Sequence, residues 1–293
     1  MQGMGRSGQA QSTEGQGALN RQDDATAAPP RWTVVIPCYN EEAFIGATLA
    51  SLAAQTERFA LIVVDNASTD ASAAVVRAWA AAHPHIATHL IDEPKPGQVH
   101  ALRAGLLAVT TELVAVCDAD TEYPPAYLAR AAALFDARGP ETVAVLAHDA
   151  VAGAEATLPA RARRWLYSNV IPYLLSGQAH AGGYAHCYRT AALGAAGGYD
   201  AAIWPYVVKD HELAHRMLKQ GNIAYATDHW CVPSLRRADR KGVRLTLFEG
   251  IVYHATPFAL KDWFFYDFLA KRFVGRKQTD VVLRQREWTT KVP

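Results

Sequence analysis

Leu113–Asp120, LVAVCDAD, is an apolar run that ends in two acidic residues. The run predicts a buried β-strand, and Pro124 and Pro125 predict a turn soon after it. Two carboxylates this close repel each other unless a cation lies beside them, and their oxygens suit Mg²⁺ or Mn²⁺ bridging a diphosphate. The stretch therefore predicts a metal site at Asp118 and Asp120. A D-x-D pair by itself is also typical of a solvated loop or a helix cap.

Upstream of this stretch, short apolar strands alternate with helical patterns. TVVIP at Thr33–Pro37 precedes CYNEE, LIVVD at Leu61–Asp65 precedes NASTD, and a strand at Thr88–Ile91 precedes EPKPGQ. This alternation predicts an α/β fold, in which a parallel sheet carries helices on both faces. Ligands of such sheets bind beyond the carboxyl ends of the strands, where all of these polar segments fall.

Asp65 and Asn40 are polar residues that follow two of the expected strands. An acid at the end of the second strand can accept hydrogen bonds from a ribose or a base edge. Taken separately, Asp65 is also typical of a turn and Asn40 of a helix cap. Their joint placement with Asp118 on one sheet edge favours a nucleotide site.

The composition sets limits on the class of protein. The 293 residues, 50% of them hydrophobic, can bury a sizeable core. The net charge of +1 provides no global field that would attract nucleic acid, so we expect no nucleic-acid partner. Four scattered cysteines predict buried free thiols in a reducing compartment. We expect no signal peptide, no membrane span and a cytoplasmic location.

The chain is expected to have three parts. Residues 1–30 are rich in Gly, Gln, Ser and Ala, which predicts a disordered leader. Residues 31–257 form the folded domain, with a further strand at Val143–Ala147 and a helix at Tyr206–Gln220. Residues 258–293 form an aromatic and basic helical tail. This tail lies either in a membrane interface or against the protein's own body or a dimer partner.

Six motifs together resemble family 2 glycosyltransferases of the GT-A fold. They occur in the family's order and spacing: VVIPCYNEE, IVVDNASTD, KPGQVHALRAGL, VCDAD, GGYD and KDHELAHRMLKQG. The resemblance covers roughly residues 33–242 and is far more specific than any single motif. It implies a mixed sheet with a parallel, Rossmann-like nucleotide-binding half. It also implies inverting transfer from a UDP-, GDP- or dTDP-linked sugar, UDP-sugars foremost, with Mn²⁺ or Mg²⁺.

The resemblance carries roles over to residues of this chain. Asp118 and Asp120 would serve the ribose and the metal, and Asp65 the base or ribose. The expected donor-nucleotide site consists of Pro37, Tyr39, Asn40, Glu41, Asp65, Lys95, Gly97, Asp118, Arg236 and Arg237.

Asp210 matches the family's catalytic base. Inversion in one displacement needs a carboxylate to take the proton of the attacking acceptor hydroxyl. An acid in the first turn of a helix is also favoured electrostatically, so helix capping is the alternative role. The chain departs from the family where Lys209 replaces an acid that many members carry, which makes Glu212 the fallback base. It departs again at Arg103, where Asn is common.

Three further features have open roles. Arg236 and Arg237 lie in VPSLRRADRKG, which is either a lid that contacts diphosphate oxygens or an ordinary solvated loop. His229 and His254 could each add a metal ligand, but single histidines near aromatic residues more often pack in the interior. Gly182-Gly183 either border the acceptor, as the resemblance implies, or only form a turn.

The expected reaction is transfer of a sugar to a hydroxyl of a glycan or lipid-linked acceptor, in polysaccharide or cell-envelope glycan synthesis. A sugar-phosphate nucleotidyltransferase is the nearest enzymatic alternative, but it should show a Gly-rich loop after the first strand, where this chain has CYNEE. A non-catalytic nucleotide-sugar or carbohydrate-binding protein on the same fold is the second alternative.

Overall fold

The computed structural model describes residues 29–175, 177–234, 245–282 and 284. The chain divides into two units, Met1–Pro30 and Arg31–Pro293. Apart from Pro29 and Pro30, the leader expected at residues 1–30 lies outside the described residues. The fold and the candidate site belong to the second unit.

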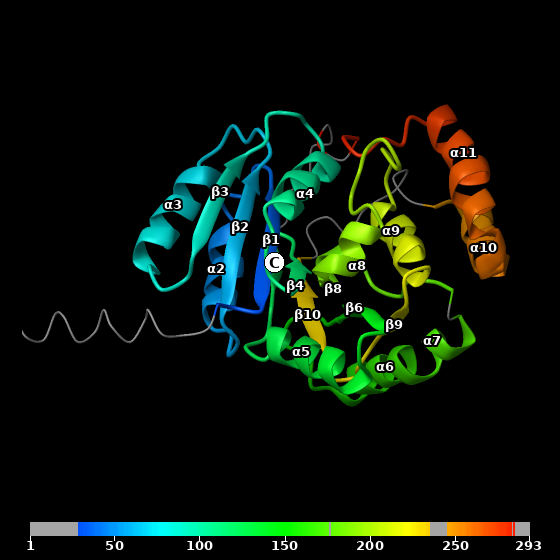
Figure 1. Cartoon of the computed structure of the whole chain (residues 1–293), viewed down its shortest axis with the longest axis horizontal. Helices are drawn as coiled ribbons and strands as arrows, with labels where there is room; N and C mark the ends of the chain where they lie inside the picture. The colour runs from blue at the N-terminus through cyan, green and yellow to red at the C-terminus, as the bar shows by residue number, and fades with distance from the viewer. Residues whose placement is uncertain (1–28, 176, 235–244, 283, 285–293) are drawn as a thin grey trace, which may run out of the picture. The chain divides into compact units, whose positions relative to one another are not determined.

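A mixed sheet forms the centre of this unit (Figure 1). Its described strands follow the order β3 (Thr88–Asp92), β2 (Phe59–Asp65), β1 (Trp32–Cys38), β4 (Leu113–Val116), β8 (His186–Arg189), β6 (Thr142–Leu146) and β9 (Asn222–Ala224). Only β8 runs against its neighbours among these strands. The predicted α/β fold is confirmed, including the parallel half at β3, β2, β1 and β4.

Helices cover both faces of the sheet because side chains alternate along each strand. Val34 and Ile36 of β1 face α2 (Ile45–Ala53), α3 (Ser72–Ala82) and α5 (Tyr127–Arg138). Val35 belongs to the opposite core, which α4 (Gln98–Leu107), α8 (Thr190–Ala195) and α9 (Lys209–Leu218) cover. At Gly105 of α4, an added Cβ would lie 2.6 Å from Val35 Cγ1, so glycine lets this helix pack closely on β1.

A second, three-stranded sheet joins β5 (Thr121–Glu122), β10 (Trp230–Pro233) and β7 (His148–Asp149). The 3₁₀ turn η1 (Gly183–Ala185) leads into β8, and α6 (Leu158–Asn169) and α7 (Ile171–Leu174) precede it. Strands of two residues show no sequence periodicity, which is why the sequence did not predict β5 and β7.

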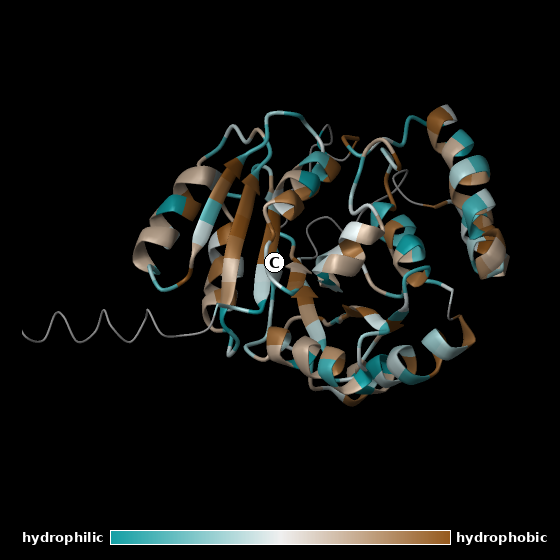
Figure 2. Cartoon of the chain, viewed as in Figure 1, coloured by the Kyte–Doolittle hydropathy of each residue, from teal (hydrophilic) through white to brown (hydrophobic). Residues whose placement is uncertain are grey.

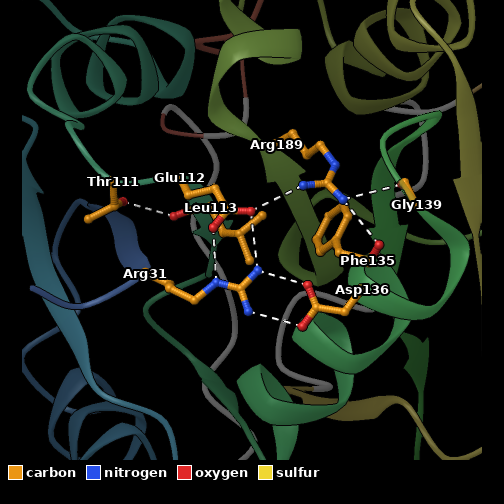
Figure 3. Close-up of polar contacts among 8 residues, drawn as sticks. All are labelled: Arg31, Thr111, Glu112, Leu113, Phe135, Asp136, Gly139 and Arg189. Atoms are coloured by element: carbon orange, nitrogen blue, oxygen red, sulfur yellow. Dashed lines mark hydrogen bonds and ion pairs between the residues drawn. The ribbon is translucent and has the colours of Figure 1, made fainter. Parts of the chain in front are cut away.

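A polar cluster fixes the edge of the sheet at which β1 and β4 begin (Figure 3). Arg31 donates to both carboxylate oxygens of Glu112 and both of Asp136. Arg189 also donates to Glu112, and to the carbonyl oxygens of Phe135 and Gly139. The bonds from Arg31 hold the pKa of Glu112 and Asp136 below the usual range. This cluster aligns strand ends opposite to the polar segments that the sequence singled out.

The C-terminal part contains α10 (Leu247–Ala255), η3 (Phe258–Leu260), the π-helix η4 (Trp263–Leu269) and α11 (Ala270–Gly275). Phe264, Phe265 and Phe273 are buried in a third core with Trp204 and Tyr253. These contacts favour packing against the protein's own body, rather than a membrane interface, for these aromatic residues. In the part of the chain that the structure describes, no helix has the length and apolar character needed to cross a bilayer.

Candidate active site

The predicted site residues at the strand ends come together at one edge of the sheet. Cys38 of β1 pairs with Asp65 of β2, and the amide of Cys117 donates to the Val35 carbonyl oxygen. Tyr39 follows β1 directly, Asp118 comes two residues after the end of β4, and both are half-buried. Pro37 lies buried within β1.

The loop after β1 is held in one conformation by the loop after β2. Asn40 adopts a left-handed conformation with φ 52°, and its side-chain oxygen accepts a hydrogen bond from the Thr69 amide at 2.8 Å. Ser68 donates its amide to Asp65 Oδ1 at 3.2 Å and accepts from the Asn40 amide. Asn40 therefore joins the two loops, and α2 begins at Ile45 without a side-chain cap.

Glu41 is buried, and its amide donates to Ser72 Oγ at 2.7 Å. Because Ser72 begins α3, this bond ties the first loop to that helix. The CYNEE segment is thus fixed by hydrogen bonds along one side of the site.

Asn66 organises the loop that carries Lys95 and Gly97, a role that the sequence analysis missed. Its amide donates to the carbonyl oxygens of Glu93 and Lys95, at 2.9 and 2.7 Å. Its side-chain oxygen accepts from the Gly97 amide at 2.9 Å. Gly97 has φ 135°, which other residues rarely adopt. Lys95 reaches Asn66 through its backbone, and its side chain is exposed.

Asp118 and Asp120 are half-buried after β4. Gln98 Nε2 donates to Asp118 Oδ1 at 3.2 Å, and the Asp118 amide donates to the Tyr123 hydroxyl at 3.0 Å. Tyr123 donates in turn to the Tyr184 carbonyl oxygen at 2.9 Å, and burial raises the pKa of its hydroxyl. The turn between the two acids is therefore anchored to the segment that precedes β8.

The donor set of the acids fits a hard divalent cation. Two carboxylates leave most positions around Mg²⁺ or Mn²⁺ open for diphosphate oxygens and water. Within the described ranges, no group of three His, Cys, Asp or Glu side chains could hold a metal. His229 is buried and stacks on Tyr127, and His254 bonds to Gln178, so neither joins the acids as a third such ligand.

Asp210 lies in the first turn of α9, directly after Val208 and Lys209. Gly183 of η1 approaches it so closely that an added Cβ would lie 3.2 Å from Asp210 Cβ. One of the two predicted acceptor-side glycines, Gly183, and the predicted base are therefore neighbours. Arg103, the second departure, forms an ion pair with Asp200 of the GGYD motif.

The surroundings of Asp210 are neutral on the side of β8. Burial lowers the pKa of His186 to about 4, even though the Asp210 carboxylate acts in the opposite direction. Burial also raises the pKa of Tyr199, and the carboxylates of Asp210 and Asp118 add to this effect.

Residues 278–282 and Arg284, which the sequence analysis did not connect with the site, lie at its edge. Arg284 lies over the ring of Tyr39, 3.4 Å from the centroid, and donates to the side-chain and main-chain oxygens of Asn66 at 2.6 and 2.8 Å. Asp280 Oδ2 accepts from the Val99 amide at the start of α4 at 2.8 Å. No sequence signal pairs these distant positions. The predicted lid residues Arg236 and Arg237 lie outside the described residues.

A family comparison decides the affiliation of the chain. The model of the family described as Glycosyl transferase family 2 matches residues 33–193. The chain belongs to this family. An uncharacterised glycosyltransferase of Mycobacterium bovis is 47% identical over 88 residues, covering 30% of this chain and 36% of the relative. An undecaprenyl-phosphate 4-deoxy-4-formamido-L-arabinose transferase of Shewanella sediminis is 34% identical over 97 residues, covering 32% and 29%. The matches thus span about a third of these curated relatives.

The fold of this family 2 member also matches solved structures. A mannosyltransferase from Pyrobaculum calidifontis, solved with GDP-Man and Mn²⁺, superimposes with a TM-score of 0.63 and 22% identity. The match covers 84% of this chain and 75% of that protein. This likeness confirms the predicted GT-A fold.

Lys209, which stands where many family 2 members carry an acid, is paired with an acid from the C-terminal part of the chain. Lys209 Nζ lies 2.9 Å from Asp280 Oδ1, and the two side chains are only 15% and 7% exposed. The C-terminal segment thus supplies an acid beside the base, so the charge of Lys209 is balanced. Glu212, the fallback base, is buried and binds Arg216 at 2.7 Å and the Tyr266 hydroxyl at 2.5 Å. These contacts commit Glu212 to holding α9 in place.

Proposed function

We propose that this protein is an inverting glycosyltransferase. It transfers a sugar from a nucleoside-diphosphate sugar to a hydroxyl of a glycan or lipid-linked acceptor. The observation that carries the proposal is the link between Asp118 and Asp210 through the Gly183-Tyr184 segment. The Asp118 amide donates to the Tyr123 hydroxyl, this hydroxyl donates to the Tyr184 carbonyl oxygen, and the adjacent Gly183 closely approaches Asp210. A base and an acidic diphosphate site held by one segment are an arrangement that suits a single displacement.

The donor half of the site has a role for each group. The ring of Tyr39 offers an aromatic face to the nucleobase, and Asp65 is positioned by Ser68 to accept hydrogen bonds from the ribose or the base. Asp118 and Asp120 would hold Mn²⁺ or Mg²⁺, which supplies positive charge to the departing diphosphate when bound.

Asp210 is the general base of the proposed reaction. Its carboxylate takes the proton of the acceptor hydroxyl while that oxygen attacks the anomeric carbon. The bond from this carbon to the diphosphate breaks in the same step, and the configuration inverts. Burial lowers the pKa of His186 to about 4, so this neighbour of Asp210 is neutral at pH 7. Gly183 carries no side chain beside Asp210, which leaves room for the acceptor next to the base.

Relatives support the choice of partners. The Shewanella sediminis relative is named for transfer to undecaprenyl phosphate, which supports a lipid-linked acceptor and a role in envelope or polysaccharide synthesis. The Pyrobaculum calidifontis protein was solved with a nucleotide sugar and Mn²⁺, which supports the donor class and the metal. All four cysteines are free and buried, which supports a cytoplasmic location. The undecaprenyl-phosphate transferase relative supports a peripheral position on the inner membrane face.

Both alternatives are weaker on structural grounds. The loop after β1 is a rigid CYNEE turn, held through Asn40 and Glu41, where a nucleotidyltransferase would need a glycine-rich loop. Lys209 was the one feature that favoured a non-catalytic binding protein. Its charge is balanced by Asp280, so Asp210 keeps the surroundings of a usable base.

The test is turnover of UDP-, GDP- and dTDP-sugars with Mn²⁺ or Mg²⁺, with and without EDTA. One donor should release its nucleoside diphosphate only with metal. Asp210→Asn should lower kcat by about 10²- to 10⁴-fold and leave donor Kd unchanged, because it removes only the proton acceptor. Asp120→Ala should lose metal-dependent donor binding.

Asp267→Asn is the matched control, because its side chain is 60% exposed and lies in the C-terminal helical region. It should keep full activity. Absence of release from every donor, with glycan and lipid acceptors present, would favour the binding-protein alternative. Full activity of Asp210→Asn would remove Asp210 from the reaction.

A further inference from the structure

Helix α6 packs with its polar side against the protein. A surface helix normally turns its apolar side chains inward. The single buried residue of α6 is Arg164, which donates to the carbonyl oxygens of Thr227 at 3.1 Å and Glu155 at 2.7 Å. Ser168, one turn further on, bonds to His148 Nε2 at 2.7 Å. The inner side of α6 is therefore held by hydrogen bonds.

The outer side of α6 carries the apolar residues. Leu158, Ala162, Trp165 and Leu166 follow the i, i+4, i+7, i+8 spacing of one helical face, and all four are exposed. The short helix α7 continues this surface with Tyr173 and Leu174. The exposed fractions are 78% for Leu158, 56% for Trp165, 85% for Tyr173 and 66% for Leu174. Figure 2 shows teal and brown alternating along this part of the chain. We call Leu158–Leu174 the α6–α7 surface.

Basic side chains flank this surface. Arg161 and Arg163 are exposed beside the apolar face of α6, and no Asp or Glu occurs between Glu155 and Asp200 in the sequence. Arg163 pairs with Asp149 at 2.6 Å, so Arg161 is the arginine offered to a lipid phosphate. Tryptophan and tyrosine beside arginine are typical of helices that lie in the interface of an anionic bilayer.

We propose that the α6–α7 surface docks onto an anionic lipid membrane. Trp165, Leu166 and Leu174 enter the boundary between headgroups and acyl chains, and Arg161 contacts lipid phosphates. A second copy of this chain fits less well. A twofold contact would bring Arg161 of both copies to the same interface, and Leu158–Leu174 contains no acid to pair with it.

The position of the α6–α7 surface in the chain connects membrane docking with the catalytic site, an inference that rests on the proposed function. Gln178, just after α7, bonds to His254 and to the carbonyl oxygen of Tyr253, which fixes the chain that leaves the surface. Gly183 follows and borders Asp210. Docking of α6–α7 would thus hold the acceptor side of the base near the membrane, where a lipid-linked hydroxyl is present.

Vesicle flotation of the full chain tests the proposal. We expect binding to phosphatidylglycerol-containing vesicles, weaker binding at 0.5 M salt, and little binding to pure phosphatidylcholine. W165A/L166A should lower the partition coefficient by at least about tenfold, and Arg161→Glu by about tenfold on anionic vesicles. Leu107→Ala, which truncates a leucine that is 76% exposed on α4, should bind like the natural sequence.

Two further measurements separate the outcomes. Donor hydrolysis in the absence of lipid should be equal in the natural sequence and W165A/L166A, so loss of donor turnover with intact flotation would sink the proposed function alone. Flotation that W165A/L166A leaves unchanged would overturn the docking surface. A dimer that is seen in sedimentation velocity for the natural sequence, and that is lost in W165A/L166A, would also overturn it.

Discussion

The Lys209–Asp280 pair should contribute more to stability than an ordinary surface ion pair. Its side chains are 15% and 7% exposed, and the 2.9 Å contact is an ion pair without hydrogen-bond alignment. Exposed pairs have coupling energies of about 0 to 1 kcal/mol, and removal of one partner of a fully buried pair costs about 3 to 5 kcal/mol. Between these limits, we expect a coupling energy of about 2 kcal/mol.

The assay is a double-mutant cycle of Asp280→Asn and Lys209→Met in urea unfolding. Asp280→Asn should be the more damaging single change, because it leaves a nearly buried ammonium unpaired and weakens the bond to the Val99 amide. The Asp267–Lys271 pair, 60% and 79% exposed, is the matched control and should give a coupling energy below about 0.5 kcal/mol.

The coupling between Lys209 and Asp280 should also be measurable as a change in kcat. In Asp280→Asn, the unbalanced charge of Lys209 lowers the basicity of Asp210, so kcat should fall, and Lys209→Met should restore part of it. Equal coupling energies in the two pairs would refute the structural reasoning. An Asp280→Asn variant with unchanged kcat would refute the electrostatic link to the base.

Three other predictions concern single side chains. Arg284→Ala should raise the donor KM about tenfold, because the guanidinium supports Tyr39; a lower KM would mean that Arg284 obstructs the site. His229→Phe should raise the free energy of unfolding by about 1 kcal/mol at pH 7, since neither ring nitrogen has a hydrogen-bond partner among the described residues. Burial lowers the pKa of His229 to about 3, so the natural sequence loses stability as pH falls below 6.5, and the variant should lose less. Burial lowers the pKa of Lys261 from 10.5 to about 8. Between pH 8 and 10.5 the unfolded chain therefore holds one more proton than the folded protein, so the free energy of unfolding should rise with pH over this range. Lys261→Met should abolish that rise in urea titrations.

The sequence was sufficient for the parallel half of the sheet and for the strand-end acids. Runs such as LIVVD are long enough to indicate buried strands, and parallel strands bring their carboxyl ends to one edge. That constraint brought Asp65 and Asp118 together before any contact was known. Beyond Pro124 the strands contain only two to five residues, so their order and the direction of β8 were not readable.

Only the tertiary structure decided how the site is completed. Asp280 reaches Val99 across 181 residues, and Arg284 reaches Asn66 across 218, contacts that no local pattern encodes. The orientation of α6 was equally hidden, because helical periodicity shows that one side is apolar but not whether that side faces the core. The sequence determined which residues share a strand end or a helix face. The packing of distant segments determined which of those residues meet, because hydrogen bonds and ion pairs between them depend on distance in space and not on spacing in the chain.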